Sequence, residues 1–394
     1  QELVAQAFAL GGTGHQAGNV HKLDDGGHHA LRRDDLCQLL QARVGHLNHA
    51  GVSPMSQTVA AALQSSLLSQ HHDGPLQQYI KMFEAVPTVR EMLASLIGIP
   101  GDHIGLTRNT SHAMSILANG LSLPTGSEVV VAHDEFPGIV YPWIPLERDG
   151  IHLKRIHPAG ATFTAADYID VFTVNTKVVI VSWVHWCTGC KIDIDQIVSA
   201  AKQRGILVIC DTIQGLGSIP VDFKSADVDF IIGGSHKWLT CPSGLGYIAA
   251  SPSMMRILKP TNIGWNSVEN SLDRDTLRPG DLKASAAIVE EGNPSFLTIV
   301  GSHAALTELT SQGIVAIGDQ VVSLASTIAG ELQARGWTLR CAVQETGLVC
   351  AVPPSSVLRM AARLDSKAID IAIRAGALRF SPHAYQTIDD LQPL

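Results

Sequence analysis

Short runs of apolar residues alternate with segments of helical periodicity along the middle of the chain. The strand-like runs are mostly rich in Val and Ile, and they cover residues 128–132, 178–183, 207–210, 230–232 and 246–250. The helical patterns cover residues 89–97, 111–118 and 194–203. Short continuous apolar strands are typical of a sheet buried on both faces. The alternation therefore predicts an α/β fold with a mostly parallel sheet covered by helices.

The pattern changes toward both ends of the chain. Residues 1–45 are irregular, with Gly-Gly pairs and at most one short helix over 35–44, and we interpret them as an N-terminal arm. Residues 46–297 carry the alternating pattern and form the expected large domain, and residues 298–394 form an expected smaller α+β domain. In the C-terminal part of the chain, we expect helices over 294–309, 315–334 and 355–364 and strands over 338–343 and 347–352.

Composition narrows the classes of function. The 394 residues are 45% hydrophobic and 16% charged, which is too apolar for a disordered chain. The net charge of −8 gives no general attraction for nucleic acid. No uninterrupted apolar run is long enough to predict a transmembrane helix. The seven cysteines are scattered and odd in number, which argues against a disulfide framework and indicates a reducing compartment.

The first residue bears on where the protein is found. The chain begins with Gln1 rather than Met and shows no charged segment followed by an apolar one. We therefore expect a cytoplasmic protein. A periplasmic location is the alternative if an export signal was removed before Gln1.

The strongest chemical signal comes from an acidic residue and a lysine. Asp211 ends one buried apolar strand, and Lys237 follows the next. In open α/β sheets, ligands bind at the carboxyl ends of the strands. A lysine in an apolar pocket has a lowered pKa and can attack a carbonyl carbon, while a carboxylate nearby can bind a protonated ring nitrogen. Pyridoxal phosphate (PLP) needs this pair of groups.

These segments, VICDTIQ over 208–214 and GGSHKW over 233–238, resemble fold-type I, class V PLP-dependent enzymes. That group includes cysteine desulfurases, C–S lyases, kynureninase and isopenicillin N epimerase-like proteins. The resemblance covers roughly residues 47–390. It implies the fold of a PLP-dependent transferase, with Lys237 bound to the cofactor as an aldimine and Asp211 against the ring nitrogen.

The resemblance extends to the residues around the cofactor. Residues 107–112 resemble the family's phosphate cup, in which the N-terminus of a helix favours a dianion. It implies that the phosphate is bound by Thr110, Ser111, Ser235 and His236, that Phe136 stacks on the ring, and that Gln214 donates to the ring oxygen. Many relatives have His where this chain has Phe136, and often Asn in the loop that here contains Trp186 and Cys187. Asn293 lies in a loop that resembles one reaching a neighbouring subunit's phosphate, which implies a homodimer with shared sites.

The resemblance also implies a place for the substrate. Arg379 opens a stretch that resembles the family's C-terminal motif, whose first Arg makes a bidentate pair with the carboxylate of an amino acid. Asn48 and His49 belong to a motif that lies beside the same carboxylate. Both ends of the chain are therefore expected to meet at the site, and the expected partner is a small amino-acid substrate rather than nucleic acid or a membrane.

The resemblance leaves the reaction open. Cysteine desulfurases carry a nucleophilic Cys on a loop shortly before this Arg, whereas residues 373–378 lead straight to Arg379, and the preceding cysteine is Cys350 in an expected strand. This disfavours a persulfide-forming desulfurase. An epimerase usually needs an acid–base group opposite Lys237, which Phe136 cannot supply. We expect a lyase or a transaminase acting at the amino group and Cα, with an epimerase or a decarboxylating enzyme as the alternative.

Two further readings of the sequence belong to other classes of protein. The chain could be a PLP-binding scaffold without turnover, although Lys237, Asp211 and Arg379 argue against it. The single C-x-x-C at Cys187 and Cys190 and the histidines near the N-terminus could bind metal, but a lone C-x-x-C and a polar arm are weak signals. We therefore expect no metal site.

Overall fold

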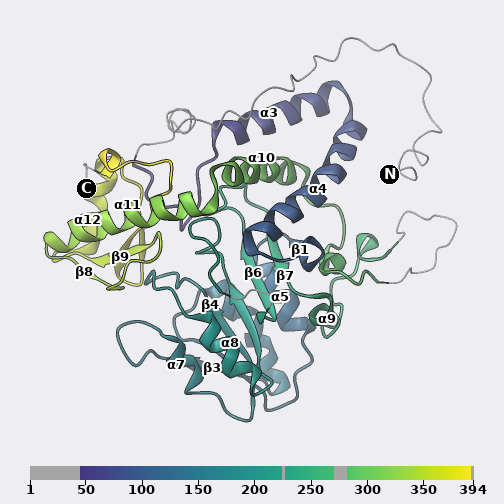
Figure 1. The fold of residues 1–394 in the computed structure, drawn as a ribbon, viewed down its shortest axis with the longest axis horizontal. Coiled ribbons are helices and arrows are strands. Elements are labelled where there is room, and N and C mark those ends of the chain that lie inside the picture. The colour runs from purple at the N-terminus through teal and green to yellow at the C-terminus, as the bar shows by residue number, and fades with distance from the viewer. Residues whose placement is uncertain (1–44, 224–226, 270–281, 392–394) are drawn as a thin grey trace. The chain divides into compact units, whose positions relative to one another are not determined.

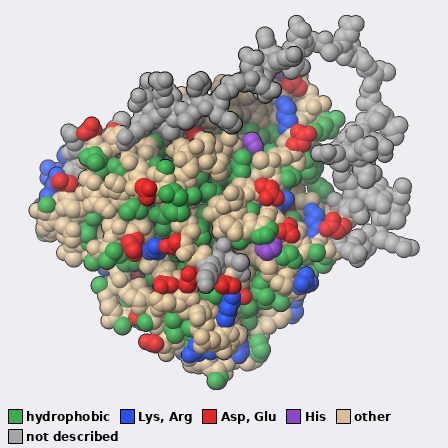
Figure 2. Space-filling model, viewed as in Figure 1, with side chains coloured by type: hydrophobic (Ala, Val, Ile, Leu, Met, Phe, Trp, Pro, Cys, Tyr) green, Lys and Arg blue, Asp and Glu red, His purple; other side chains and the backbone are tan. Residues whose placement is uncertain are grey.

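The computed structural model describes residues 45–223, 227–269 and 282–391 (Figure 1). The expected N-terminal arm, with its short helix over 35–44, thus lies outside the described residues except for Gly45. On the face that Figure 2 shows, acidic and basic side chains lie interspersed among apolar ones.

Seven strands form the larger sheet, in the order β1-β7-β6-β5-β4-β2-β3. They are β1 (Ile104–Thr107), β2 (Glu128–Ala132), β3 (His152–Ile156), β4 (Thr176–Ser182), β5 (Leu207–Asp211), β6 (Phe230–Gly234) and β7 (Gly246–Ala249). The neighbours from β3 to β6 pair in parallel, whereas β7 runs antiparallel to β6 and β1. The prediction of a mostly parallel sheet is confirmed.

The two faces of this sheet are buried in separate apolar cores. Val179 of β4 and Val208 of β5 belong to one core, and their chain neighbours Ile180 and Ile209 belong to the other. All four side chains are fully buried. Because successive residues of a strand point to opposite faces, two-sided burial requires apolar residues at every position. This is why the strands appear in the sequence as unbroken apolar runs.

Helices cover both faces of the larger sheet. The longer ones are α3 (Gln57–His72), α4 (Pro75–Ile97), α5 (Thr110–Gly120), α8 (Ile194–Lys202) and α10 (Phe296–Gln312), and the short ones are α6 (Pro137–Val140), α7 (Ala165–Ile169) and α9 (Pro252–Met255). Helix α5 contributes to the core of one face, and α4, α8 and α10 contribute to the core of the other.

A smaller antiparallel sheet has the order β10-β11-β9-β8. Its strands are β8 (Thr338–Leu339), β9 (Val349–Val352), β10 (Ala372–Arg374) and β11 (Ala377–Phe380), and the helices beside it are α11 (Ile314–Ala334) and α12 (Val357–Ser366). A third apolar core lies between them. All strands of the larger sheet fall within residues 46–297 and all of the smaller within 298–394. The division into domains at these residues stays a prediction.

The start of the described chain pairs with its end. His46 forms an isolated bridge with Asp370, and Asn48 forms one with Ser381. The side chain of His46 also makes an ion pair with Asp370 at 2.8 Å. These contacts bring residues 46–48 together with residues 370–381, beside the smaller sheet.

Helix α11 is long and apolar enough to cross a membrane by length and composition alone. The sequence analysis predicted a helix over 315–334 but no membrane span, because Asp319 and Glu331 interrupt the apolar run. One stripe of the helix, including Leu324, Ile328 and Leu332, is buried in the core beside the smaller sheet. A helix with one buried stripe is what packing on a sheet requires, so α11 is weak evidence for a membrane span.

Two cysteines of the described residues are joined by a disulfide. Cys190, between β4 and α8, forms a disulfide with Cys341, which follows β8. The sequence pattern did not indicate this pair, and the two residues of the C-x-x-C motif, Cys187 and Cys190, are not bonded to each other. The free cysteines in the described part of the chain, including Cys187 and Cys350, are buried.

Replacing Gly246 with Ala should destabilise the fold. A Cβ at Gly246 would lie 2.6 Å from the backbone carbon of Asn109, in the turn that opens α5, and 2.8 Å from the Gly233 carbonyl oxygen. Because backbone atoms cannot rotate away, we expect a loss of roughly 1–3 kcal/mol, measured as a lowered melting temperature. The control is Gly330→Ala in α11, where a Cβ meets open space. That variant should be neutral or more stable; equal effects of the two substitutions would contradict the steric argument.

Candidate active site

A cavity of about 200 Å³ lies at the carboxyl ends of the parallel strands. Most of the residues singled out from the sequence line it: Thr110, Ser111, Phe136, Asp211, Gln214, His236, Lys237 and Arg379. They come from segments spread over the whole described chain. The topology therefore brings together, in one cavity, the groups that the sequence presents far apart.

Lys237 and Asp211 are the charged centre of the cavity. Asp211 ends β5, and Lys237 follows β6, the neighbouring parallel strand. Asp211 is 3% exposed and Lys237 is 8% exposed. Burial raises the pKa of Asp211 to about 7, with Lys237 opposing the rise. Burial and the positive charge of Arg379 lower the pKa of Lys237 to about 8, so its amine is closer to the neutral, nucleophilic form.

One end of the cavity is formed by the start of α5. The Asn109 side chain caps this helix by accepting a hydrogen bond from the His112 N–H at 2.8 Å. The Thr110 hydroxyl is buried and has no hydrogen-bond partner within the described chain. Ser111 lies next to Gly138, where a Cβ would overlap the Ser111 hydroxyl. Helix N–H groups and hydroxyls at this end can bind an anion.

Aromatic side chains form one wall of the cavity. The Lys237 amine lies 5.6 Å from the centre of the Phe136 ring. The Phe136 and Trp186 rings pack edge to face with centres 5.6 Å apart. The Trp186 indole N–H donates to the Asp134 carbonyl at 2.7 Å, which fixes this ring. Phe136 is 44% exposed, so its face is available to a planar ligand.

Arg379 brings a buried cation to the other side of the cavity. It lies on β11 and is 2% exposed, and its Nη1 donates to the Trp186 carbonyl at 3.0 Å. Its buried Nε has no partner within the described chain. Burial lowers the pKa of Arg379 to about 10, which leaves the guanidinium charged at neutral pH. A buried guanidinium with a free donor is suited to a carboxylate.

Other residues expected at the site have partners elsewhere. The Ser235 hydroxyl donates to the Leu245 carbonyl, and Ser235 does not line the cavity. The Gln214 amide lines it, but its Nε2 donates to the Ala50 carbonyl and its Oε1 accepts from the Trp238 indole. These bonds occupy groups that the sequence reading assigned to the phosphate and to the ring oxygen.

The N-terminal motif lies behind the cavity rather than in it. His49 is fully buried, with its Nδ1 3.0 Å from the Ser381 carbonyl oxygen and its Nε2 3.0 Å from the Tyr385 hydroxyl. The Asn48 Oδ1 is buried and has no hydrogen-bond partner among the described residues, and Asn48 does not line the cavity either. The backbone of Ala50 and Gly51 lines it instead.

Asn293 lies in a second cavity, of about 340 Å³. Its Oδ1 accepts a hydrogen bond from the Tyr79 hydroxyl at 2.8 Å. Arg108 and Glu291 line the same cavity and form an ion pair at 3.3 Å. Asn293 therefore does not share a cavity with Lys237 in the single chain.

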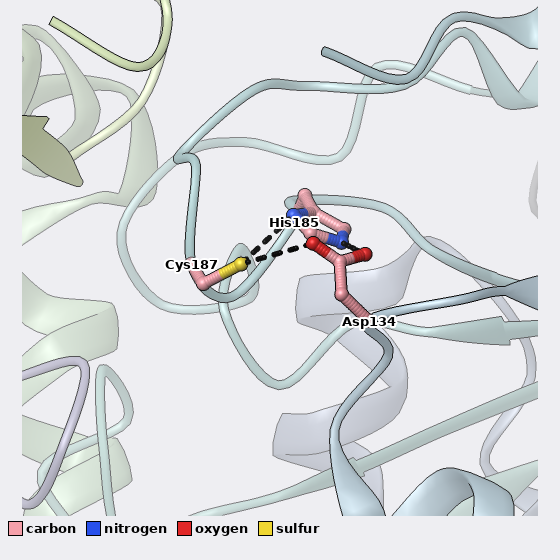
Figure 3. A group of neighbouring side chains, drawn as sticks. All are labelled: Asp134, His185 and Cys187. Atoms are coloured by element: carbon pink, nitrogen blue, oxygen red, sulfur yellow. Dashed lines mark hydrogen bonds and ion pairs between the residues drawn. The ribbon is translucent and has the colours of Figure 1, made fainter. Parts of the chain in front are cut away.

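Asp134, His185 and Cys187 form a cluster of polar side chains (Figure 3). The Asp134 carbonyl accepts the indole N–H of Trp186 in the aromatic wall. The His185 Nε2 lies 3.3 Å from an Asp134 oxygen, and the Cys187 sulfur lies 3.5 Å from the other. Although burial opposes the shift, the His185 ring lowers the pKa of Asp134 to about 2. The three donor atoms lie within 4.8 Å of one another, which a metal ion could use. The ion pair accounts for the arrangement without one, and the expectation of no metal site stays a prediction.

Sequence reasoning missed two groups near the site. Arg374 lines the cavity, and the Asp134–His185 ion pair braces its wall. Arg374 could have been found from alternation, because a hairpin over residues 372–380 places it on the same face as Arg379. The ion pair joins residues 51 positions apart in the chain, and no local pattern indicates it.

Comparison with known proteins gives the family. A family model described as "Aminotransferase class-V" matches residues 46–393, so the chain belongs to this family. The resemblance inferred from the motifs around Asp211 and Lys237 is thereby confirmed, as is the expectation of an enzyme family.

Two curated relatives differ in their described activities. An uncharacterized aminotransferase from Bacillus subtilis, YcbU, is 24% identical over 349 residues, covering 87% of this chain and 92% of the relative. A probable cysteine desulfurase from Aeropyrum pernix is 29% identical over 287 residues, covering 70% of this chain and 69% of the relative.

Solved structures show the same fold. A lysine mutant of the protein C-DES, with glycine covalently linked to its PLP cofactor, gives a TM-score of 0.83 at 20% identity and covers 90% of this chain and 96% of that one. A complex of C-DES, described as a cystine C–S lyase, with its product cysteine persulfide gives 0.81 at 20% identity, covering 89% and 96%. The expected fold of a fold-type I PLP-dependent transferase is confirmed.

Asp211→Asn should change how the stability of the cofactor-free protein depends on pH. Folded Asp211 keeps its proton up to about pH 7, whereas its ordinary pKa is 3.8. Between these values the folded state binds more protons than the unfolded state, so stability is lost as the pH rises. The melting temperature of the wild type should therefore fall, relative to the Asn variant, from about pH 4 to about pH 7. The exposed Asp149→Asn serves as the control; a pH-independent difference between wild type and Asp211→Asn would contradict the raised pKa.

Proposed function

We propose that the chain is a PLP-dependent enzyme that acts on the amino group and Cα of an amino acid. The observation that carries the proposal is the buried pair of Lys237 and Asp211 at the carboxyl ends of neighbouring strands. Membership of the class-V aminotransferase family and the likeness to a PLP-bound structure support it.

The lining of the cavity fits this cofactor. The Thr110 hydroxyl has no partner within the described chain and lies at the start of α5, where a phosphate dianion would be stabilised. Asp211 is a buried carboxyl with one backbone donor, the Ile213 N–H at 2.9 Å. A protonated ring nitrogen would give this carboxyl a further hydrogen-bond donor. The exposed face of Phe136 would stack on the ring, and His236 also lines the cavity.

Each group then has a distinct task. When bound, PLP withdraws electrons from the Cα of an amino acid joined to it. Asp211 would hold a proton on the ring nitrogen. The Lys237 amine, with its lowered pKa, can take a proton from Cα and return it near neutral pH. Arg379 would bind the α-carboxylate and so fix which bond at Cα stands perpendicular to the ring.

A lyase or a transaminase is favoured over an epimerase. The Phe136 ring, whose centre lies 5.6 Å from the Lys237 amine, cannot exchange a proton and so cannot be the acid–base group that an epimerase needs opposite Lys237. Trp186 beside it donates its N–H to the Asp134 carbonyl, so this wall offers no acid–base pair to a second face of the substrate. An epimerase and a decarboxylating enzyme stay the alternatives.

A persulfide-forming desulfurase is disfavoured by the segment before Arg379. Residues 372–380 form a hairpin with only Ala375 and Gly376 between its strands, which leaves no long loop to carry a nucleophile. Cys350 is buried in β9, and burial raises its pKa to about 12. Relatives described as cysteine desulfurases belong to the same family, so an assay has to decide.

A homodimer with shared sites is part of the proposal. The second cavity, which holds Asn293, contains the Arg108–Glu291 ion pair and the start of α10. If the neighbouring subunit's phosphate lies near Asn293, the amide N–H₂ of Asn293 is available to it, because Tyr79 occupies only the amide oxygen.

Lys237→Ala should abolish both covalent binding of PLP and turnover, because no other amine lines the cavity within the described residues. Borohydride reduction of the wild type followed by peptide mapping should place the reduced cofactor on Lys237. The matched control is Lys283→Ala, which replaces another lysine whose pKa is lowered by burial but which lies outside the cavity. A reduced adduct on another residue, or none, would refute the proposal.

The type of reaction can be identified by analysing the products. Purified PLP-loaded protein incubated with amino acids should form a keto acid, with release of the side-chain leaving group or transfer of the amino group. Cys187→Ser and Cys350→Ser should retain this activity, because neither thiol lines the cavity. Racemisation without a keto acid would indicate an epimerase, and release of CO₂ would indicate a decarboxylating enzyme. Loss of sulfur transfer in a cysteine variant would indicate a desulfurase. A cofactor absorbance that no amino acid changes would indicate a scaffold without turnover.

A further inference from the structure

The cavity contains a second guanidinium to which the proposed function gives no role. Arg374 lines it together with Lys237 and Arg379. The Arg374 side chain is half-buried, and its Nη1 donates to the Ile373 carbonyl at 2.8 Å. Among the described residues, no carboxylate lies within ion-pair distance of it.

The register of the hairpin places the two arginines side by side. Arg374 of β10 pairs with Ala377 of β11, and Arg379 pairs with Ala372. Residues two apart on a strand share a face, so both arginines project from the same face of the hairpin. They occupy diagonal positions, roughly 7 Å apart. Each lies opposite an alanine, which leaves room for a guanidinium and a ligand.

The turn of the hairpin holds this register. Ala375 and Gly376 both have positive φ, 45° and 73°, as in the two-residue turns that suit the twist of antiparallel strands. A slip of one residue would move Arg374 to the opposite face, away from Arg379. Ala375 thus adopts a left-handed backbone conformation that non-glycine residues rarely adopt. The Arg340 guanidinium donates to the Ala375 carbonyl at 2.9 Å and supports the turn.

None of the anions assigned to the cavity lies with Arg374. Lys237, Arg374 and Arg379 line it, and Asp211 is the one carboxyl among the described lining residues. In the proposed function, Asp211 binds the ring nitrogen, Arg379 binds the α-carboxylate, and the start of α5 binds the phosphate. Arg374 is then left without a counter-charge. After burial, its positive charge is one of the causes that lower the pKa of both Lys237 and Arg379.

We propose that Arg374 binds an acidic group at the end of the substrate's side chain. The substrate is then an amino acid with a second carboxylate or a comparable anion such as a sulfinate. This inference rests on the proposed function, because it takes the α-carboxylate to be bound by Arg379. It makes Arg374 a specificity-determining residue, since a neutral side chain would leave the guanidinium unpaired.

Ligand binding tests the inference without any turnover. PLP-loaded protein is titrated by calorimetry with succinate and with butyrate, which differ by one carboxylate. We expect wild type to prefer succinate, and Arg374→Gln to reduce that preference by roughly 10- to 100-fold, as for the loss of a charged hydrogen bond. Arg374→Lys should keep part of it. The control is Arg363→Gln, which removes a cation from the exposed face of α12 and should keep the preference.

Kinetics provide the second measurement. The ratio of kcat/KM for aspartate, glutamate and cysteine sulfinate to kcat/KM for alanine and serine should be high in wild type. Arg374→Gln should lower this ratio by a similar factor, mainly through KM, because the lost contact is made in the ground state as well.

The outcomes separate this inference from the proposed function. Equal binding of succinate and butyrate by wild type would overturn the role of Arg374, even if neutral amino acids are turned over. An Arg374→Gln variant that keeps the wild-type preference would overturn it as well. If no amino acid changes the cofactor's absorbance, the proposed function fails, and the succinate titration still decides whether Arg374 forms an anion site.

Discussion

The site depends on keeping an amine and a carboxyl out of water at the ends of two adjacent strands. β5 and β6 are buried on both faces, so whatever follows them is held in an apolar surrounding. Burial then raises the pKa of Asp211 and lowers that of Lys237, bringing both values toward neutrality. The same packing that stabilises the sheet therefore brings the pKa values of both groups toward neutrality.

Two-sided burial also explains which parts of the fold the sequence could predict. Strands β2 and β4–β7 appear as apolar runs because both faces need apolar side chains. β3 was missed because it is an edge strand whose residues, apart from Ile156, are not fully buried. β1, β10 and β11 are short, and Gly105, Arg374 and Arg379 take the place of apolar side chains in them, so no apolar run shows. β1 is defined by its pairing with β7, and β11 by its pairing with β9.

Site residues could be predicted where a local sequence motif marks them. Their hydrogen-bond partners from distant parts of the chain could not. Asp211 and Lys237 were found from their residue types and their positions at the ends of buried strands. Arg379 was found because its segment resembles the family's C-terminal motif. His49 was assigned to the substrate, yet its ring nitrogens lie within hydrogen-bonding distance of Ser381 and Tyr385 at the far end of the chain. Gln214 is likewise occupied by Ala50 and Trp238. No local pattern reveals such partners.

The segment that carries Trp186 is fastened to the smaller sheet's part of the chain at three points. Arg379 donates to the Trp186 carbonyl, the Thr346 hydroxyl donates to the Gly189 carbonyl, and Cys190 is bonded to Cys341. A shift of the smaller sheet would carry this tryptophan with it. The Trp186 wall of the cavity and the Arg379 guanidinium would then move together, so neither could leave the cavity while the other stayed in place.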